Sequence, residues 1–232
     1  MMENKVVFSG HQPCFLPYMG FFYKMFQSDV FVLDDDVQYS TKSFQNSNFI
    51  KVNGAKHRVT VPVSYVHGDA INEVRIGYAR NWDEKLLKTL KMSYGKAPHF
   101  DEVYSMMEDA IMEKYEYLSD LNIHLLWDIK ERLGLKCNVV IASRDVPTTL
   151  KNNERNLFQC RALGADIYYS GVGGKAYNDE IAYRKRGIGL VYSDYEPVVY
   201  RQLGGDFIPD LSVLDYLFNE GFTIPQAWVR HI

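Results

Sequence analysis

The segment from Ser9 to Pro17 places a histidine beside the predicted start of a helix. Val6-Val7-Phe8 is a β-rich run, and His11 follows it directly after a Ser-Gly stop. Apolar residues then recur at helical spacing from Tyr18 to Gln27, so the first N–H groups of that helix should face the same loop. His11 is therefore either a base or an anion contact, or a histidine that only closes a loop.

Three consecutive aspartates, Asp34 to Asp36, follow the next apolar run, Val30 to Leu33. If the strand continues, Asp34 and Asp36 share one of its faces and Asp35 lies on the other. Such carboxylates can hold Mg²⁺ together with substrate oxygens, or bind an amine or sugar hydroxyls. The alternative is a solvated strand end that binds nothing.

A glycine-rich turn that carries a lysine, Tyr168 to Lys175, follows a later strand-like run. Its glycines would let the backbone approach an anion closely, with Lys175 as a point charge. The turn is not a P-loop, because the glycine spacing differs and no Ser or Thr follows the lysine. It is not a nucleophile elbow either, because Tyr168 stands where that motif needs glycine. A flexible turn without a ligand is the alternative.

Each of the three segments follows a predicted strand, and the predicted strands alternate with helices along the chain. Strand, loop, helix and strand over residues 6–33 predict a right-handed parallel crossover. Further along, strands at 138–142, 167–169 and 188–192 alternate with helices, one of them over 153–163. We therefore predict an α/β fold with a mostly parallel, Rossmann-like three-layer sheet, in which the carboxyl ends of the strands meet at one edge.

The middle of the chain has a different pattern. Asn53-Gly54 predicts a β-hairpin between two β-compatible arms. Helical spacing follows over 82–92 and over 101–133, the latter as one long helix or as two. A last helix is predicted over 212–219, with Ser212 as its N-cap. We expect one α/β domain over 1–232, with a hairpin plus helical insertion at 44–135.

Composition excludes several classes of protein. The chain has 232 residues, of which 47% are hydrophobic, so it can bury a core and is too apolar to be disordered. A formal charge of −3 argues against a general nucleic-acid binder. No apolar stretch approaches the roughly 18 residues of a membrane helix, and no signal-peptide core is seen, which predicts a cytoplasmic location. Three scattered cysteines read as reduced thiols, and six scattered histidines predict no zinc centre.

Taken together, these segments resemble the WbqC-like family over nearly the whole chain. The resemblance begins at His11-Gln12-Pro13-x-Phe15-x-Pro17-Tyr18-x-Gly20-Phe21-Phe22 and continues through Asp35-Asp36-Val37-Gln38-Tyr39, Asn46-x-Asn48-x-Ile50-Lys51, Thr60-Val61-Pro62-Val63, Tyr94-x-Lys96-Ala97-Pro98-x-Phe100, Leu163-Gly164-Ala165-Asp166, Tyr169-Ser170-Gly171-x-Gly173-Gly174-x-x-Tyr177 and Leu211-Ser212-x-Leu214-Asp215-x-Leu217-Phe218-Asn219-x-Gly221. One departure is Ser47, where the family is expected to favour Arg between the two asparagines.

The resemblance implies a bacterial protein encoded among O-antigen and surface-polysaccharide genes, where the family is suspected of attaching an amino-acid or acyl group to amino sugars. The opening is also similar to that of the nucleotidylyltransferase superfamily, such as pantothenate synthetase. That superfamily's HxGH signature is missing, because Gly20-Phe21-Phe22 stands where Gly-His is required. The second likeness therefore bears on architecture and not on chemistry.

The leading hypothesis is an enzyme of O-antigen or surface-polysaccharide biosynthesis that transfers an aminoacyl or acyl group to the amine of a nucleotide-linked amino sugar. His11, Asp35 and Asp36 are the predicted catalytic residues. The predicted substrate and phosphate contacts are Gln12, Pro17, Tyr18, Gly20, Gln38, Asn46, Asn48, Ser170, Gly171, Gly173, Gly174, Lys175 and Tyr177. This hypothesis requires the imidazole, the acidic pair and the lysine-bearing turn to share one cavity.

Two versions of the reaction remain open, as do two other functions. One version uses ATP with Mg²⁺ and passes through an acyl-adenylate, whose pyrophosphate needs positive groups around it. The other uses a preactivated donor such as a thioester or aminoacyl-tRNA. The rival functions are a nucleotide-sugar binding protein without catalysis and a metal-dependent glycosyltransferase with a DxD-like site. The expected partner is a nucleotide sugar, with no membrane, and a homodimer is left open.

Overall fold

The computed structural model describes residues 5–41 and 43–231 and contains a central sheet of five parallel strands. The strands, in spatial order, are β7 (Asn138–Ile141), β2 (Val30–Leu33), β1 (Val7–His11), β8 (Ile167–Ser170) and β9 (Gly189–Tyr192). From the central β1 the chain proceeds to β2 on one side and returns later to β8 on the other. The strand order therefore reverses between β1 and β8, which is where doubly wound sheets bind ligands.

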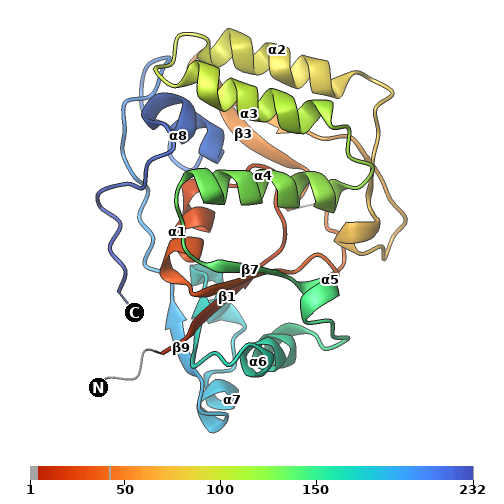
Figure 1. Ribbon diagram of the computed structural model, residues 1–232, viewed down its shortest axis with the longest axis vertical. Helices are drawn as coiled ribbons and strands as arrows, with labels where there is room; N and C mark the ends of the chain where they lie inside the picture. Colours follow the sequence, from red (N-terminus) through yellow and green to blue (C-terminus); the bar gives the residue numbers. More distant parts are fainter. Residues whose placement is uncertain (1–4, 42, 232) are drawn as a thin grey trace.

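Alternate side chains of each strand enter two separate cores, which confirms the three-layer prediction. Val7 and Tyr169 point into the larger core, whereas Phe8 and Tyr168 point into the smaller one on the other face. This alternation follows from the two-residue period of a strand, and burial on both faces explains the continuous apolar runs in the sequence. Figure 1 shows α6 and α7 on the side of the sheet opposite α4.

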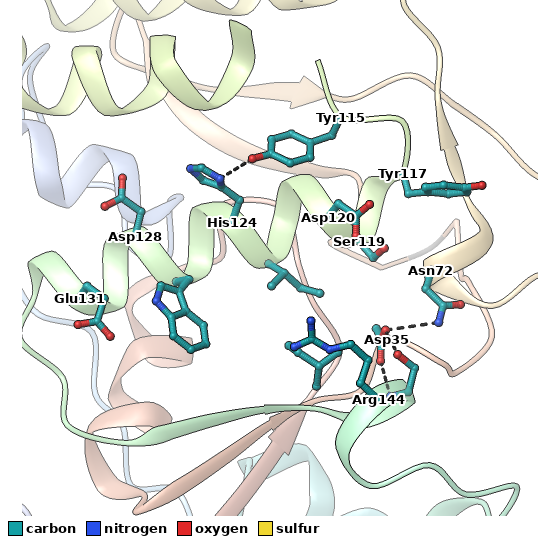
Figure 2. A pocket seen from close by; sticks show the side chains of 14 residues that line it. Asp35, Asn72, Tyr115, Tyr117, Ser119, Asp120, His124, Asp128, Glu131 and Arg144 are labelled. Atoms are coloured by element: carbon teal, nitrogen blue, oxygen red, sulfur yellow. Dashed lines mark hydrogen bonds between the residues drawn. The ribbon is translucent and has the colours of Figure 1, made fainter. Parts of the chain in front are cut away.

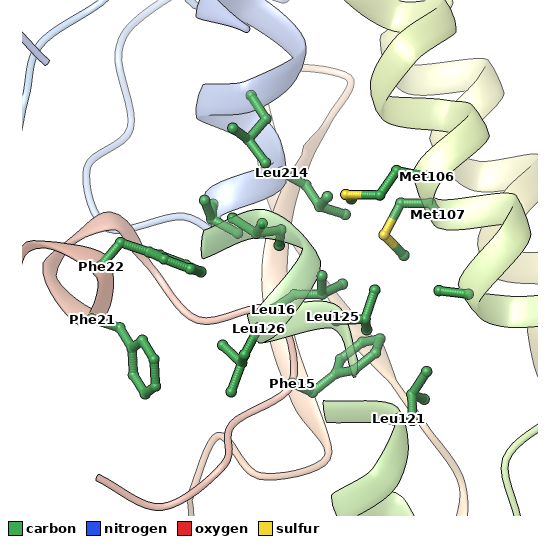
Figure 3. Packing of buried hydrophobic residues seen from close by; sticks show 14 of the residues in the cluster. Phe15, Leu16, Phe21, Phe22, Met106, Met107, Leu121, Leu125, Leu126 and Leu214 are labelled. Carbon is green, nitrogen blue, oxygen red and sulfur yellow. The ribbon is translucent and has the colours of Figure 1, made fainter. Parts of the chain in front are cut away.

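Helices cover both faces of the sheet. The larger core packs against α1 (Met19–Gln27) and α4 (Leu118–Arg132), as Figure 3 shows around Phe22 and Leu125. The smaller core packs against α6 (Asn152–Ala162) and α7 (Glu180–Lys185). A short helix, α5 (Ala142–Asp145), follows β7 directly.

The segment between β2 and β7 consists of small sheets and helices. Its elements are β3 (Ser47–Val52), β4 (Ala55–Thr60), β5 (Val63–Ser64), η1 (Ile71–Glu73), β6 (Arg75–Ile76), α2 (Trp82–Tyr94), α3 (Phe100–Met112) and α4. The hairpin predicted at Asn53-Gly54 is present, and the 101–133 stretch is two helices. The β5–β6 pair was not predicted, because two-residue strands are too short to show periodicity.

The C-terminal helix α8 (Val213–Glu220) has Ser212 as its N-cap, as predicted, and the Ser212 hydroxyl accepts the N–H of Leu214. The N–H of Val213 donates to the carbonyl of Pro17, so α8 is tied to the loop that follows β1. Asp215 anchors the preceding segment, because its carboxylate accepts the hydroxyls of Tyr94 and Tyr200. The loop that follows β1 is therefore held in place by the C-terminal helix α8.

Among the residues that the structure describes, no helix is both long and apolar enough to cross a membrane. The three cysteines, Cys14, Cys137 and Cys160, lie buried as free thiols.

Candidate active site at the β1–β8 switch point

A cavity of about 670 Å³ lies at the carboxyl ends of β1 and β8, and we refer to it as the switch-point cavity. Its size is that of a small-molecule site. The lining residues are Gly10, His11, Gln12, Tyr18, Gly20, Lys24, Asp34, Asn156, Tyr168, Ser170, Gly171, Val172, Gly173, Gly174, Tyr177, Ser193, Tyr195, Pro197 and Asp210. The structure therefore brings the His11 loop and the glycine-rich turn together, although 160 residues of chain separate them.

His11 is held as a neutral imidazole. Its Nδ1 lies 2.9 Å from the carbonyl oxygen of Gln12, which can only accept, so Nδ1 carries the proton and Nε2 is the acceptor nitrogen. Burial lowers the pKa of His11 to about 4, and the Lys24 ammonium acts in the same direction. The ring also packs edge-on against Phe21 at a centroid distance of 5.0 Å.

Lys24 is a buried cation of the cavity that sequence reasoning missed. Its Nζ donates to the carbonyl of Gly10 at 2.9 Å, and its side chain projects from α1 beneath the end of β1. Burial lowers the pKa of Lys24 to about 8, which the negative charge of Asp34 opposes. A signal was present, because Lys24 stands three residues after Phe21 and four after Gly20, on the helix face that the apolar pattern buries.

The loop after His11 is fixed by amide side chains from other elements. Asn48 donates to the carbonyl of Leu16 at 2.7 Å, and Asn122 donates to the carbonyl of Pro13 at 3.0 Å. Gln45 donates to the side chain of Gln12 at 2.7 Å. Leu16 is fully buried with φ +47°, a left-handed conformation that a branched residue adopts only when its surroundings impose it.

Two glycines of the cavity are required by close packing. A Cβ on Gly20 would lie 2.3 Å from the ring of Tyr18, so glycine lets that ring fold back over the start of α1. A Cβ on Gly174 would lie 2.1 Å from the hydroxyl oxygen of Ser170. Gly171 and Gly173 have open space at the corresponding position, so the turn presents its backbone to the cavity there.

The three aspartates separate, and only Asp34 lines the switch-point cavity. Arg155 on α6 donates from Nε to Asp34 at 2.9 Å and also forms an ion pair with Asp36. Burial raises the pKa of Asp34, and the charge of Arg155 opposes that rise. The guanidinium occupies the space between the two carboxylates, so this donor set does not fit Mg²⁺ as it stands.

Asp35 points to the other side of the end of β2. Its carboxylate accepts the backbone N–H of Ser143 at 2.9 Å and the Ser143 hydroxyl at 2.6 Å, and it lies near Asn72 (Figure 2). Asp34 and Asp35 therefore face opposite sides, as predicted for a continuing strand, although β2 ends at Leu33 and Asp35 and Asp36 lie in a turn. The requirement that Asp35 and Asp36 share a cavity with His11 is not met.

Lys175 also lies outside the set of residues that line the cavity. Its Nζ lies 5.5 Å above the ring of Tyr192, within the 3₁₀ helix η2 (Val172–Ala176) that follows β8. The glycine turn leads into this short 3₁₀ helix and not directly into an α-helix, so Lys175 leaves the turn in a direction that the sequence did not reveal. Lys24 supplies a cation to the cavity instead.

The remaining predicted contacts fall into two groups. Pro17 and Asn48 line an adjoining hollow of about 450 Å³, which shares His11, Tyr18 and Asp210 with the switch-point cavity. Gln38 is exposed and bridges to Ala70, and Asn46 donates to the carbonyl of Val61. Gln38 and Asn46 therefore lie away from both hollows.

Cys14 also lines the adjoining hollow, next to His11. Burial raises the pKa of its thiol to about 12, which the Lys24 ammonium opposes. The thiolate that a nucleophilic cysteine needs is therefore scarce at neutral pH, which disfavours Cys14 as a nucleophile.

Comparison of the sequence with known proteins identifies the family to which the chain belongs. The model of the WbqC-like protein family matches residues 12–226. The chain belongs to this family. It is 31% identical over 219 residues to the uncharacterized protein Rv1507c of Mycobacterium tuberculosis, which covers 93% of this chain and 94% of the relative. No solved structure matches the chain.

The structure also shows what surrounds Ser47, where arginine was expected for a WbqC-like protein. Arg58 on the facing strand β4 donates to the Ser47 hydroxyl from Nε at 3.0 Å and from a terminal nitrogen at 2.7 Å. A guanidinium is thus present beside residue 47, and Arg58 on the paired strand β4 supplies it.

Proposed function

We propose that this WbqC-like protein is an enzyme of surface-polysaccharide biosynthesis that transfers an acyl or aminoacyl group to the amine of a nucleotide-linked amino sugar. The observation that carries the proposal is a neutral imidazole with an acceptor Nε2, at the edge of a cavity of small-molecule size at a topological switch point. The kind of substrate comes from the family resemblance, and the place of reaction comes from the geometry.

Amide formation needs a group that removes a proton from nitrogen. When the sugar amine attacks the acyl carbon, its nitrogen becomes positively charged and strongly acidic, so a weak base is sufficient at that stage. In the proposal His11 takes this proton on Nε2 while the bond between the acyl carbon and the leaving group breaks. Because its pKa is about 4, His11 is available as a base throughout the neutral range.

The other lining residues suit the sugar and the base of a nucleotide-linked sugar. Hydroxyls and amides line much of the switch-point cavity; they belong to Gln12, Tyr18, Asn156, Tyr168, Ser170, Tyr177, Ser193 and Tyr195. These groups can hydrogen-bond to sugar hydroxyls, and tyrosine rings can stack on a sugar or a base. In the proposal the phosphates contact the N–H groups that open η2, and Lys24 contributes the nearby positive charge.

The test is a mass measurement on the acceptor. The purified protein is incubated with a dTDP-linked amino sugar and either ATP, Mg²⁺ and glycine or an acyl thioester. The proposal expects the acceptor to gain the mass of the acyl group, and AMP release would identify the ATP-dependent version. His11→Gln keeps the size and polarity of the side chain but removes the base, so its product should be lost while substrate binding remains.

A nucleotide-sugar binding protein without catalysis is the second candidate. It is favoured by the position of Asp35 and Asp36, neither of which lines the switch-point cavity. Tight binding of the dTDP-linked sugar with no turnover from any donor would select it. A glycosyltransferase with a DxD-like metal site is less well supported, because a metal would have to displace Arg155 from Asp34 and Asp36.

A further inference from the structure

A second cavity, of about 880 Å³, lies between α4, η1 and the carboxyl end of β7, and we call it the edge cavity (Figure 2). It is lined by Asp35, Asn72, Tyr115, Tyr117, Ser119, Asp120, Ile123, His124, Trp127, Asp128, Glu131, Ile141, Ser143 and Arg144. None of these residues lines the switch-point cavity. The proposed acyl transfer therefore gives it no role.

The charge of the edge cavity is unbalanced. Four carboxylates line it, and Arg144 is the one arginine or lysine among the described lining residues. Asp128 is paired with Arg132 at 2.7 Å and Glu131 with Lys130 at 2.6 Å, but Asp120 has no ion pair among the described residues. Burial raises the pKa of Asp120, as does the nearby charge of Asp35, with Arg144 opposing. A cation placed between Asp35 and Asp120 would relieve this repulsion.

Aromatic rings form the walls around these carboxylates. Trp127 is 44% exposed, and Figure 2 shows its neighbours His124 and Asp128 on the same helix. Lys130 already lies over the ring of Trp127 at 5.6 Å, and Arg75 lies over Tyr117 at 5.1 Å. Each ring thus makes a cation–π contact with the protein and has further ring surface to offer a ligand.

Ser119 gives an independent sign of a ligand. The residue is only 2% exposed and lines the edge cavity, yet its hydroxyl has no hydrogen-bond partner among the residues that the structure describes. Hydroxyls in buried residues are normally paired, and the Ser119 oxygen is not one of the fully enclosed unpaired atoms, so it opens onto the cavity. A ligand with an N–H donor would supply the missing partner.

We propose that the edge cavity binds a small organic cation, namely a protonated primary amine attached to an apolar or aromatic body. The ammonium lies between Asp35 and Asp120 and donates to the Ser119 hydroxyl, and the body packs against Trp127. Anions of the same shape are rejected by the carboxylates. The proposal is independent of the acyl transfer, because it uses no residue of the switch-point cavity.

Three probes of one shape test this specificity: phenethylamine, its neutral N-acetyl derivative and the anion 3-phenylpropionate. Binding is measured by calorimetry and by the emission of Trp127, the exposed tryptophan, since Trp82 and Trp228 are buried. We expect saturable binding of phenethylamine with a Kd below about 10 mM, the weak end for a ligand of this size. The neutral probe should bind at least about 5-fold more weakly, and the anion not at all.

The matched variants are Asp120→Asn and Asp109→Asn, which remove the same charge from an exposed position of α4 and of α3. Asp120→Asn should weaken phenethylamine about 5-fold, whereas Asp109→Asn should leave its affinity unchanged. Equal binding of all three probes, no saturation up to about 10 mM, or equal effects of the two variants would each overturn the proposal. None of these outcomes bears on the proposed acyl transfer, which is tested separately by the mass measurement on the acceptor.

Discussion

The switch-point cavity and the edge cavity lie on opposite sides of the end of β2, and adjacent residues, Asp34 and Asp35, line one cavity each. In the switch-point cavity, the buried Asp34 is paired with Arg155, and the other charged lining residues, Lys24 and Asp210, are of opposite sign. In the edge cavity, Asp120 has no such partner among the described residues. The difference teaches that the switch-point cavity combines charges of both signs with hydroxyls and amides, whereas carboxylates predominate in the edge cavity.

The largest expected effect separates the two cavities by stability. Arg155→Met should lower the free energy of unfolding by about 3 to 5 kcal/mol, because it leaves the buried Asp34 without its cation. Arg144→Met in the edge cavity should change it by less than about 0.5 kcal/mol, because Arg144 is exposed and forms no ion pair with the described residues. Urea unfolding of both variants measures this. Equal losses would mean that the charges of the two cavities are not held differently.

The next effect concerns activity. His11→Gln should lower kcat by at least about 100-fold, the low end of what a general base contributes, with KM little changed. Asp120→Asn should leave kcat unchanged, because the edge cavity takes no part in the proposed reaction. Steady-state kinetics on the dTDP-linked acceptor measures both. If His11→Gln instead unfolded at a much lower temperature than the natural protein, its loss of activity would assign His11 a structural role.

A matched pair of glycines tests how tightly the β8 turn is packed. Gly174→Ala should destabilise the protein by about 1 to 3 kcal/mol, because its Cβ would meet the Ser170 hydroxyl. Gly173→Ala has open space around the new methyl group and should change stability by less than about 0.5 kcal/mol. Thermal unfolding of the two variants decides the point. If Gly173→Ala were the more damaging of the two, the geometry of this turn would be wrong.

The smallest effect is a pH dependence. The pKa of His11 is about 4 in the folded protein and near 6.5 in the unfolded chain, so between these values only the unfolded chain takes up the proton. Stability should therefore fall as the pH falls from about 6.5 to about 4. Lys24→Met removes one of the two causes, so the pKa of His11 should rise and this loss should shrink by about 1 kcal/mol.

The measurement is an NMR titration of the His11 ring in both proteins, together with urea unfolding across the same pH range. An unchanged or lower pKa of His11 in Lys24→Met would contradict the electrostatic coupling between the two residues.

Most of the fold was predictable because it depends on local periodicity. The Asn53-Gly54 hairpin and the Ser212 N-cap follow from residues within a few positions of one another. The parallel sheet follows from the order of strands and helices along the chain. Asp34 and Asp35 also face opposite sides as predicted, although β2 ends at Leu33 and Asp35 lies in a turn. Sequence spacing alone was sufficient at these places.

The candidate site was less predictable because its charges depend on distant partners. Arg155 pairs with Asp34 across 121 residues, and nothing near either residue in the sequence reveals the pair. Lys175 was expected in the cavity, but the 3₁₀ geometry of its turn places its ammonium over Tyr192. Lys24 was overlooked because its spacing puts it on the buried face of the helix but does not show that its ammonium lies beneath the end of β1, where it donates to the carbonyl of Gly10.

A crystal soaked with the dTDP-linked amino sugar tests the central claim most directly, namely that substrate binds at the reversal of strand order between β1 and β8. We expect ligand density between Tyr18 and the turn at Gly171 to Gly174, with the amino nitrogen within hydrogen-bonding distance of Nε2 of His11. Ligand density only at places without contact to His11, the edge cavity included, would contradict the claim.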